Sequence, residues 1–465
     1  MRILLVSTYE LGHQPIHLAS PAAALTRDGH EVTCLDLSVE NADFSALDDV
    51  DAIAFSVPMH TAMRLAITTA SLIRRARPEI PIALYGLYAD VGRERTLGTV
   101  TDAIFCGEYE PSLRAWARSL MGSTPSLSVR VHLGKSDFEV PKRELLPGLG
   151  EYARLEYEGQ ALLVGAVEAS HGCRHRCRHC PIPAVYDGRL RVLGEDLVLA
   201  DIAQLVAAGA EHITFADADF LNAPAYSLSV LRSSHRHFPE LTYDVTVKVE
   251  HIVNHRDLWE EMASLNVLFV VSAFESVDDR TLEILDKGHT VRDMIEAAGV
   301  LRESGVYLRP TWLPFLPWTR PGEIAELFQF LDANDLAGAI DPVQLAIRVL
   351  IPEGSLLADH PAMKPHLSHF DPEALTWVWE FEDLESARLH KELDRIAAEA
   401  SDCKEDAGDT LSAMRSIVSD ISGIDLGEQA AVGSGPRLSE SWFCCAEPTV
   451  GQATAVSGIS LRRGL

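Results

Sequence analysis

A ten-residue stretch combines two kinds of metal-binding side chain. HGCRHRCRHC, residues 171–180, contains three cysteines and three histidines. The cysteines are Cys173, Cys177 and Cys180, spaced as C-x3-C-x2-C. Thiolates bind zinc and iron–sulfur clusters, and imidazoles also bind zinc. We therefore expect this stretch to hold a metal ion or a cluster.

The spacing favours a cluster over zinc. Zinc sites usually show two C-x2-C pairs, or one such pair followed by a pair of histidines. Either His175 or His179 would have to supply the fourth zinc ligand, because no second half follows at a suitable spacing. A [4Fe–4S] cluster held by three thiolates instead leaves one iron free to bind another molecule.

A second pair of cysteines lies near the end of the sequence. Cys444 and Cys445 are neighbours in WFCCAEP, residues 442–448. The Cα atoms of neighbouring residues lie about 3.8 Å apart, which is below the usual range for a disulfide. Such a pair is suited to binding a soft, sulfur-seeking atom or to redox switching. We expect both residues to take part in catalysis.

The N-terminal third alternates short apolar runs with helical patterns. Five runs, rich in valine, isoleucine and leucine, predict strands, and residues 18–28 and 61–76 predict helices between them. This alternation predicts a parallel, doubly wound (Rossmann-like) α/β sheet. Ligands of such sheets bind beyond the carboxyl ends of the strands. The loops expected at a site are 8–17, 57–62 and 86–93.

The central part predicts a second set of strand and helix units. A first strand, residues 161–170, leads directly into the cysteine stretch. Repeated units of this kind predict a partial (β/α)6 barrel, with its chemistry at the carboxyl ends of the strands. The five further strands are expected at 211–220, 241–250, 267–276, 305–315 and 342–352.

Length and composition narrow the class of protein. The 465 residues carry a formal net charge of −28, which argues against a general nucleic-acid binder. No apolar run is long enough to cross a bilayer, and the first residues do not resemble a signal peptide. We therefore expect a cytoplasmic protein without membrane partners, whose eight cysteines are thiols or metal ligands.

Composition and pattern divide the chain into four parts. A Rossmann-like domain is expected over 1–125, a linker over 126–160 and the partial barrel over 161–355. The last part, 356–465, is expected to be mostly helical and flexible, with Trp377 and Trp379 near the start of a helix.

The cysteine motif at the end of a first barrel strand resembles the radical S-adenosylmethionine (SAM) superfamily. The resemblance implies a [4Fe–4S] cluster whose free iron binds the amino and carboxylate groups of SAM. It implies an external electron donor of the flavodoxin or ferredoxin type. In FADAD and SAFES it assigns SAM contacts to Asp217 and Asp219 (amino group) and to Glu275 and Ser276 (ribose). Arg348, on the sixth expected strand, is a further cofactor-binding candidate.

The N-terminal third is similar to the cobalamin-binding domain of one radical SAM class. ALTRDGHEVTCLDLS, DAIAFSVP, PIALYGLYA and DAIFCGEYE carry the similarity. The D-x-H-x-x-G signature, whose histidine ligates cobalt in other cobalamin proteins, is absent. Cobalamin is therefore a candidate cofactor without such a histidine, and a Rossmann-like domain without a cofactor is the alternative.

The tail motif CCAEP resembles the CUAEP/CCAEP-tail radical SAM proteins, some of which are associated with organoarsenical biosynthesis. The resemblance implies reductive cleavage of SAM and carbon–arsenic bond formation on a small molecule, with Cys444 and Cys445 holding the substrate. One alternative is a cobalamin-dependent radical SAM methyltransferase. A second alternative is a non-catalytic redox sensor that uses the cluster and the cysteine pair.

Overall fold

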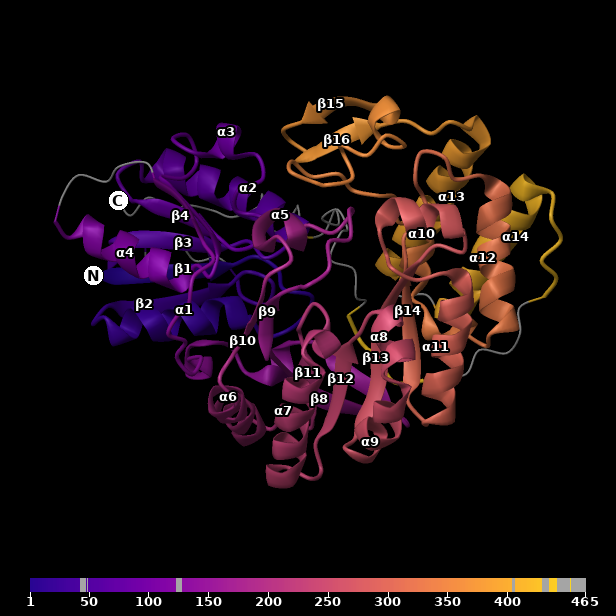
Figure 1. The fold of residues 1–465 in the computed structure, drawn as a ribbon. Coiled ribbons are helices and arrows are strands. Elements are labelled where there is room, and N and C mark those ends of the chain that lie inside the picture. The colour runs from indigo at the N-terminus through magenta and orange to yellow at the C-terminus, as the bar shows by residue number, and fades with distance from the viewer. Residues whose placement is uncertain are drawn as a thin grey trace.

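The computed structural model describes residues 1–465 except 42–46, 48, 123–127, 404–405, 429–434, 441–451 and 453–465. Two sheets built mainly from parallel strands lie next to each other, each with helices packed on it (Figure 1). The N-terminal sheet has the strand order β2-β1-β3-β4-β5-β6. Its strands are β1 (Arg2–Ser7), β2 (Glu31–Asp36), β3 (Ala52–Ser56), β4 (Ile82–Tyr85), β5 (Ala103–Gly107) and β6 (Ser128–His132).

The N-terminal sheet confirms the doubly wound prediction. All neighbouring strands are parallel. Helices α1 (Ile16–Arg27) and α4 (Glu110–Leu120) pack on one face, and α2 (His60–Ala76) packs on the other. Strand order reverses between β1 and β3, and ligands of open α/β sheets bind at the carboxyl ends beside that reversal. The loops after β1 and β3 are therefore the ligand-binding edge of this sheet.

The second sheet forms a half-barrel with the order β14-β13-β12-β11-β8-β7-β17. Five consecutive strands are parallel, and β7 and β17 are antiparallel additions at one edge. The strands are β7 (Arg154–Tyr157), β8 (Gln160–Val167), β11 (His212–Phe215), β12 (Thr242–Thr246), β13 (Val267–Glu275), β14 (Tyr307–Trp312) and β17 (Arg437–Leu438). The helices packed against this sheet include α6 (Glu195–Ala207), α7 (Pro224–His237), α8 (Val249–Asn254), α11 (Val291–Glu303) and α12 (Pro321–Ala333).

The sixth expected strand of the barrel is not formed. Residues Pro342–Ala346 make a short 3₁₀ helix, η7, in which the Gln344 amide donates to the Asp341 carbonyl. Pro342 has no amide hydrogen to donate to a neighbouring strand, which favours a turn here. Among the described residues, only an isolated bridge between Phe315 and Arg348 continues the sheet beyond β14.

Two further segments differ from the prediction. Residues 126–160, expected to be a linker, contribute β6 to the N-terminal sheet and β7 to the half-barrel. The helix expected around Trp377 and Trp379 begins only at α13 (Leu384–Cys403), which is followed by α14 (Ala407–Ser422). The two tryptophans instead lie in β16 (Thr376–Trp379), which pairs with β15 (Leu367–Asp371). Threonine, valine and tryptophan favour strands, which explains the difference.

The β15–β16 hairpin packs on the N-terminal domain, far from it in sequence. Leu375, in the turn, is fully buried in the core formed by α2 and β3. Its side chain fills the space beside Gly92, where an added Cβ would lie 2.6 Å from the Leu375 methyl group. The Ala374 carbonyl lies 2.8 Å from His60 Nε2. The C-terminal region therefore completes the N-terminal core.

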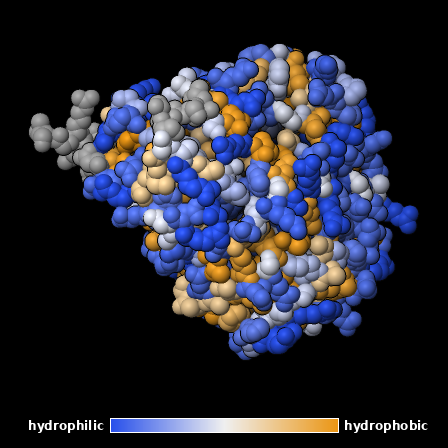
Figure 2. Space-filling model, turned by 60° about the vertical axis from the view of Figure 1, so that its left-hand side comes forward, coloured by the Kyte–Doolittle hydropathy of each residue, from blue (hydrophilic) through white to orange (hydrophobic). Residues whose placement is uncertain are grey.

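The visible outer surface mixes hydrophilic and apolar side chains, with apolar groups gathered across its middle and lower parts (Figure 2). None of the helices within the described residues is long and apolar enough to cross a membrane.

Arg143 ties three parts of the molecule together. It lies in η2 (Arg143–Leu145), between the two sheets in sequence, and is buried. Its guanidinium donates to both carboxylate oxygens of Asp201 in α6, at 2.9 and 2.8 Å, and to the Ala166 carbonyl of β8 at 2.6 Å. It also donates to Gln14 in the loop after β1. This one side chain therefore fixes the first loop of the N-terminal sheet against the first strand of the half-barrel.

Replacing Asp201 with alanine should destabilise the protein strongly. The change leaves the Arg143 charge buried without its partner, which typically costs about 3–5 kcal/mol. Urea unfolding followed by fluorescence would measure the loss. Glu261→Ala is the matched control, because it removes an exposed partner of Arg232 and should change the unfolding midpoint little. Equal losses in the two variants would contradict the role given to Arg143.

Candidate active site

The cysteine stretch forms a loop at the carboxyl end of the first barrel strand. The loop follows β9 (Ser170–Gly172), which pairs with β10 (Leu190–Val192). Gly172 has a φ of +77°, and an added Cβ there would collide with the Arg189 carbonyl. A glycine is therefore required immediately before the first cysteine. Cys173 and Cys177 are buried and Cys180 is partly exposed, and none of the three forms a disulfide within the described part of the chain.

Two side chains from other parts of the barrel reach this loop. The Asn222 amide, in η4 (Phe220–Asn222) after β11, donates to Cys173 Sγ at 3.4 Å. Lys287 is buried; burial lowers its pKa, but Glu275 outweighs burial and raises it, with smaller contributions from Cys177 and Cys180. Asn222 thus supplies a hydrogen-bond donor, and Lys287 a positive charge, beside the three cysteines. Thiolates of cysteine are the ligands that hold a [4Fe–4S] cluster. The sequence analysis assigned neither Lys287 nor Asn222 to the cluster loop.

Glu275 lies at the end of β13 with a φ of +67°, a left-handed conformation that is rare outside glycine. Its Oε1 accepts hydrogen bonds from Lys287 Nζ and His179 Nε2, each at 3.1 Å. Burial alone would raise the Glu275 pKa, but Lys287 and His179 outweigh burial and hold it well below its usual range. Glu275 is thus an anion that joins the cluster loop to the end of β13.

Asp217 follows β11 and is 2% exposed. One carboxylate oxygen accepts from the Ser170 hydroxyl and the other from the Ala169 amide, at 2.9 Å. Burial raises the pKa of Asp217 to about 6, while these two hydrogen bonds oppose the rise. Because both oxygens are used, Asp217 positions the backbone just before the cluster loop.

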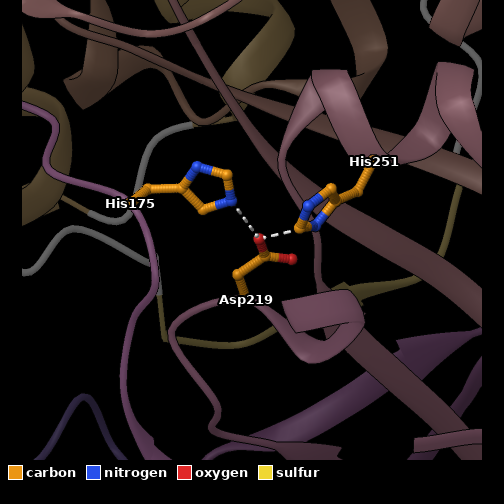
Figure 3. A group of neighbouring side chains, drawn as sticks. All are labelled: His175, Asp219 and His251. Carbon is orange, nitrogen blue, oxygen red and sulfur yellow. Dashed lines mark ion pairs between the residues drawn. The ribbon is translucent and has the colours of Figure 1, made fainter. Parts of the chain in front are cut away.

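Asp219 lies two residues further on and faces two imidazoles (Figure 3). His251 Nδ1 and His175 Nε2 lie 2.8 and 3.5 Å from Asp219 Oδ2. His175 comes from the cluster loop and His251 from α8. The structure therefore brings Asp219 to the cluster loop. The sequence analysis considered His175 only as a possible zinc ligand and did not identify His251.

The other predicted cofactor-binding residues have different surroundings. Ser276 is half-buried at the end of β13, and its hydroxyl accepts from the Asp278 amide at 3.1 Å. The Arg348 guanidinium lies 4.0 Å from the centre of the Trp379 ring and donates to the Trp379 carbonyl. None of the contacts recorded for Arg348 in the described part of the chain reaches the cluster loop. Cys444 and Cys445 lie outside the described residues.

A chain of alternating carboxylates and histidines crosses between the two sheets. His17 Nδ1 lies 2.8 Å from Glu10 Oε1, and its Nε2 lies 3.6 Å from Glu168. His171 Nε2 and Nδ1 lie 3.2 Å from Glu168 and 2.8 Å from Glu108, respectively. Glu10, His17 and Glu108 follow strands of the N-terminal sheet, whereas Glu168 and His171 precede Cys173. The carboxyl ends of the two sheets therefore meet at this charged chain.

The edge of the N-terminal sheet fits a large ligand with amide groups, such as cobalamin. Three buried carboxylate oxygens there, Glu10 Oε2, Glu108 Oε1 and Glu110 Oε2, have no hydrogen-bond partner within the described residues. The amide groups around a corrin ring would supply donors for them. Gly86, with a φ of +118°, lets β4 approach the Val57 backbone, from which an added Cβ would lie only 3.0 Å.

A small cavity of about 20 Å³ lies on the inner side of the half-barrel. Arg309 on β14 pairs with Asp341 at 3.2 Å in its wall. Glu440 also lines the cavity and accepts from the Tyr9 hydroxyl of the N-terminal domain at 2.6 Å. After β17 the chain therefore reaches the first loop of the N-terminal sheet at Glu440. This residue lies four positions before Cys444 in the sequence.

Raising the pH should loosen the contact between the two sheets. Burial lowers the pKa of His17, but Glu10 and Glu168 outweigh it and raise the pKa to about 9. An unfolded histidine titrates near pH 6.5, so this stabilisation is complete below pH 6.5 and is lost as the pH rises through about 9. We expect a melting temperature on the order of 5 °C lower at pH 9.5 than at pH 6.5 from this group.

His17→Gln provides the control for that measurement. Glutamine keeps a polar side chain but has no charge to lose, so the contribution of residue 17 disappears from the pH profile. Thermal melting at both pH values would give the difference. If the variant and the parent protein showed the same pH dependence, His17 would not be charged in the folded protein.

Family models match both halves of this arrangement. Residues 2–117 match the B12 binding domain, and residues 167–328 match the radical SAM superfamily. A radical SAM domain implies a [4Fe–4S] cluster and SAM, and a B12-binding domain implies cobalamin.

The chain is also similar to individual proteins. It is 22% identical over 329 residues to the hopanoid C-3 methylase of Methylococcus capsulatus, a match over 66% of this chain and 62% of that protein. It therefore spans less than two thirds of that relative's length. The cobalamin-dependent SAM radical enzyme OxsB with aqua-cobalamin bound superposes with a TM-score of 0.66 and 14% identity, over 86% of this chain and 67% of OxsB.

The radical SAM methyltransferase TsrM from Kitasatospora setae, with tryptophan and a SAM analogue bound, superposes with a TM-score of 0.58 at 17% identity. That match covers 72% of this chain and 71% of TsrM. At these identities the two structures show a shared fold, in which a cobalamin-type domain and a radical SAM half-barrel occur together. The chain therefore combines a radical SAM domain with a B12-binding domain.

Proposed function

We propose that this enzyme is a cobalamin-dependent radical SAM methyltransferase that acts on a small molecule. The observation that carries the proposal is the meeting of the two carboxyl edges at Glu168. One edge belongs to the B12-binding domain and the other to the radical SAM domain, so a methyl carrier and a radical source would share one space. The hopanoid C-3 methylase and TsrM support this function over the carbon–arsenic chemistry expected from the tail motif.

The residues of the chain have separate tasks in this proposal. Cys173, Cys177 and Cys180 hold the cluster, and Lys287 balances part of the thiolate charge. When bound, the cluster supplies the electron that cleaves SAM, and cobalamin supplies a carrier for the methyl group. An external flavodoxin- or ferredoxin-type protein delivers the electron. Glu275 and Ser276 lie on the side assigned to the ribose of SAM, and Asp217 orders the backbone that precedes the cluster.

The inner cavity has room for about one water molecule, so it supports a polar substrate through the charged groups of its wall and not through its volume. Arg309, Asp341 and Glu440 offer charges of both signs in its wall. Arg348 contacts β16 and is not among the residues that line this cavity. We place the substrate between the cavity and the charged chain around Glu168, because a transferred methyl group must pass from the cobalamin edge to the substrate.

Anaerobic turnover tests the proposal. The full-length protein, loaded with cluster and cobalamin, is incubated with reductant and SAM that carries a deuterated methyl group. Methyl donation by SAM leaves S-adenosylhomocysteine, whereas reductive cleavage leaves 5′-deoxyadenosine and methionine. We expect both nucleosides by mass spectrometry, and a cob(II)alamin signal by electron paramagnetic resonance.

The cluster-ligand variants make the test specific. Cys173→Ala, Cys177→Ala and Cys180→Ala should each lower the iron content and abolish 5′-deoxyadenosine formation. Cys106→Ala is the control, because Cys106 is buried in β5 of the other sheet. Formation of 5′-deoxyadenosine without S-adenosylhomocysteine would exclude methyl transfer. Absence of both would favour the redox-sensor alternative.

A second candidate, carbon–arsenic bond formation, rests on the neighbouring cysteines alone. Paired thiolates bind soft atoms such as trivalent arsenic. Adding arsenite to the same turnover should then give an organoarsenical product by mass spectrometry, and Cys444→Ala with Cys445→Ala should remove that product while keeping the cluster. Unchanged product formation in the double variant would contradict a role for the tail.

A further inference from the structure

Three metal-binding side chains meet beside the cluster loop without being cluster ligands. The candidate donor atoms of His175, Asp219 and His251 all lie within 4.8 Å of one another (Figure 3). They come from three elements: the cluster loop, the start of η4 and helix α8. We refer to these three residues as the His–Asp–His site.

Hydrogen bonding does not account for this arrangement. Asp219 is 1% exposed, and its Oδ1 accepts from the Leu221 amide at 3.3 Å. Its Oδ2 makes no hydrogen bond within the described residues, and neither do His175 Nε2 and His251 Nδ1. The nitrogens lie near the oxygen but are not aligned to donate to it. A buried oxygen without a donor is costly, so a ligand is expected between the three atoms.

The donor set selects the class of ligand. Two imidazole nitrogens with one carboxylate oxygen suit divalent transition metals such as Zn²⁺ and Fe²⁺, whereas Mg²⁺ and Ca²⁺ prefer oxygen alone. We infer that His175, Asp219 and His251 bind one divalent transition-metal ion, a site separate from the cluster. This inference goes beyond the proposed function and does not depend on methyl transfer.

The surroundings support a cation at this position. Glu250 Oε2 lies 3.9 Å from His175 Nδ1, where it would orient the ring from the side away from the metal. Lys248 Nζ lies 3.5 Å from the same Glu250 oxygen, so the nearest cation is already paired. The carboxylates of Asp219 and Glu250 therefore outnumber the lysine around the His–Asp–His site.

The site would also act on the cluster loop. His175 lies two residues after Cys173, and Asn222, which donates to Cys173 Sγ, lies three residues after Asp219. A metal ion joined to His175 and Asp219 would therefore clamp the two segments that hold Cys173. Removing the ion is expected to loosen this part of the cluster loop.

The ammonium group of SAM is the rival ligand, because it also needs acceptors and because Asp219 is a candidate contact for it. The two ligands differ in a measurable way. A metal ion binds without SAM and shows nitrogen and oxygen neighbours by X-ray absorption. An ammonium pocket holds no metal once SAM is bound.

Zinc is the probe, since it is absent from the cluster. The full-length protein, with its cluster loaded anaerobically, is dialysed against Zn²⁺, and zinc, iron and sulfide are measured per chain. We expect one zinc per chain with an unchanged iron content. The zinc absorption edge should show ligands at about 2.0–2.1 Å and no sulfur at about 2.3 Å.

Asp219→Asn and His251→Gln should each weaken zinc binding at least about tenfold. His255→Ala is the matched control, because its ring lies 5.8 Å from that of His251 but outside the site, and it should bind zinc normally. Circular dichroism melting establishes that each variant is folded. Absence of zinc, equal binding in all variants, sulfur neighbours at the zinc, or complete displacement of zinc by saturating SAM would each overturn the inference.

Discussion

The buried ion pair between Arg143 and Asp201 is the constraint on which the relative position of the two sheets depends. Burying both charges is expensive unless their geometry is good and every donor is used. Arg143 meets this condition by reaching α6, the end of β8 and the loop after β1 at once. Because these three acceptors belong to different parts of the chain, the full set of Arg143 hydrogen bonds forms only when both domains are in place.

The same contact between the two domains brings together the charged chain of carboxylates and histidines around Glu168. Isolated surface pairs contribute little to stability, but here five titratable groups lie where two carboxyl edges close on each other. Burial lowers the pKa of both histidines, but Glu168 outweighs it, together with Glu10 at His17 and Glu108 at His171, and the pKa of both stays high. In turn, both histidines outweigh burial and lower the pKa of Glu168 to about 2. Each domain thus supplies charges that the other domain neutralises.

Much of this architecture could be predicted from local patterns. The apolar runs predicted β1 to β5 and the five parallel strands of the half-barrel, and the cysteine spacing singled out the cluster loop, because both signals depend on neighbouring residues. Long-range partners were missed. Nothing near Lys287 or Asn222 in sequence shows that each reaches the cluster loop. The strand predicted over 342–352 was wrong for a related reason. The apolar side chains of this segment are buried in the core, but Pro342 has no amide hydrogen for pairing with a strand.

The burial of Leu375, in the hairpin turn, affects how the N-terminal domain folds during synthesis and whether the chain can be cut into fragments. The N-terminal domain leaves the ribosome first, but one of its core side chains is synthesised about 260 residues after the B12-binding match ends. Until then the space beside Gly92 has no occupant from this hairpin. A fragment that ends before this hairpin would expose the apolar side chains of the N-terminal core that Leu375 covers.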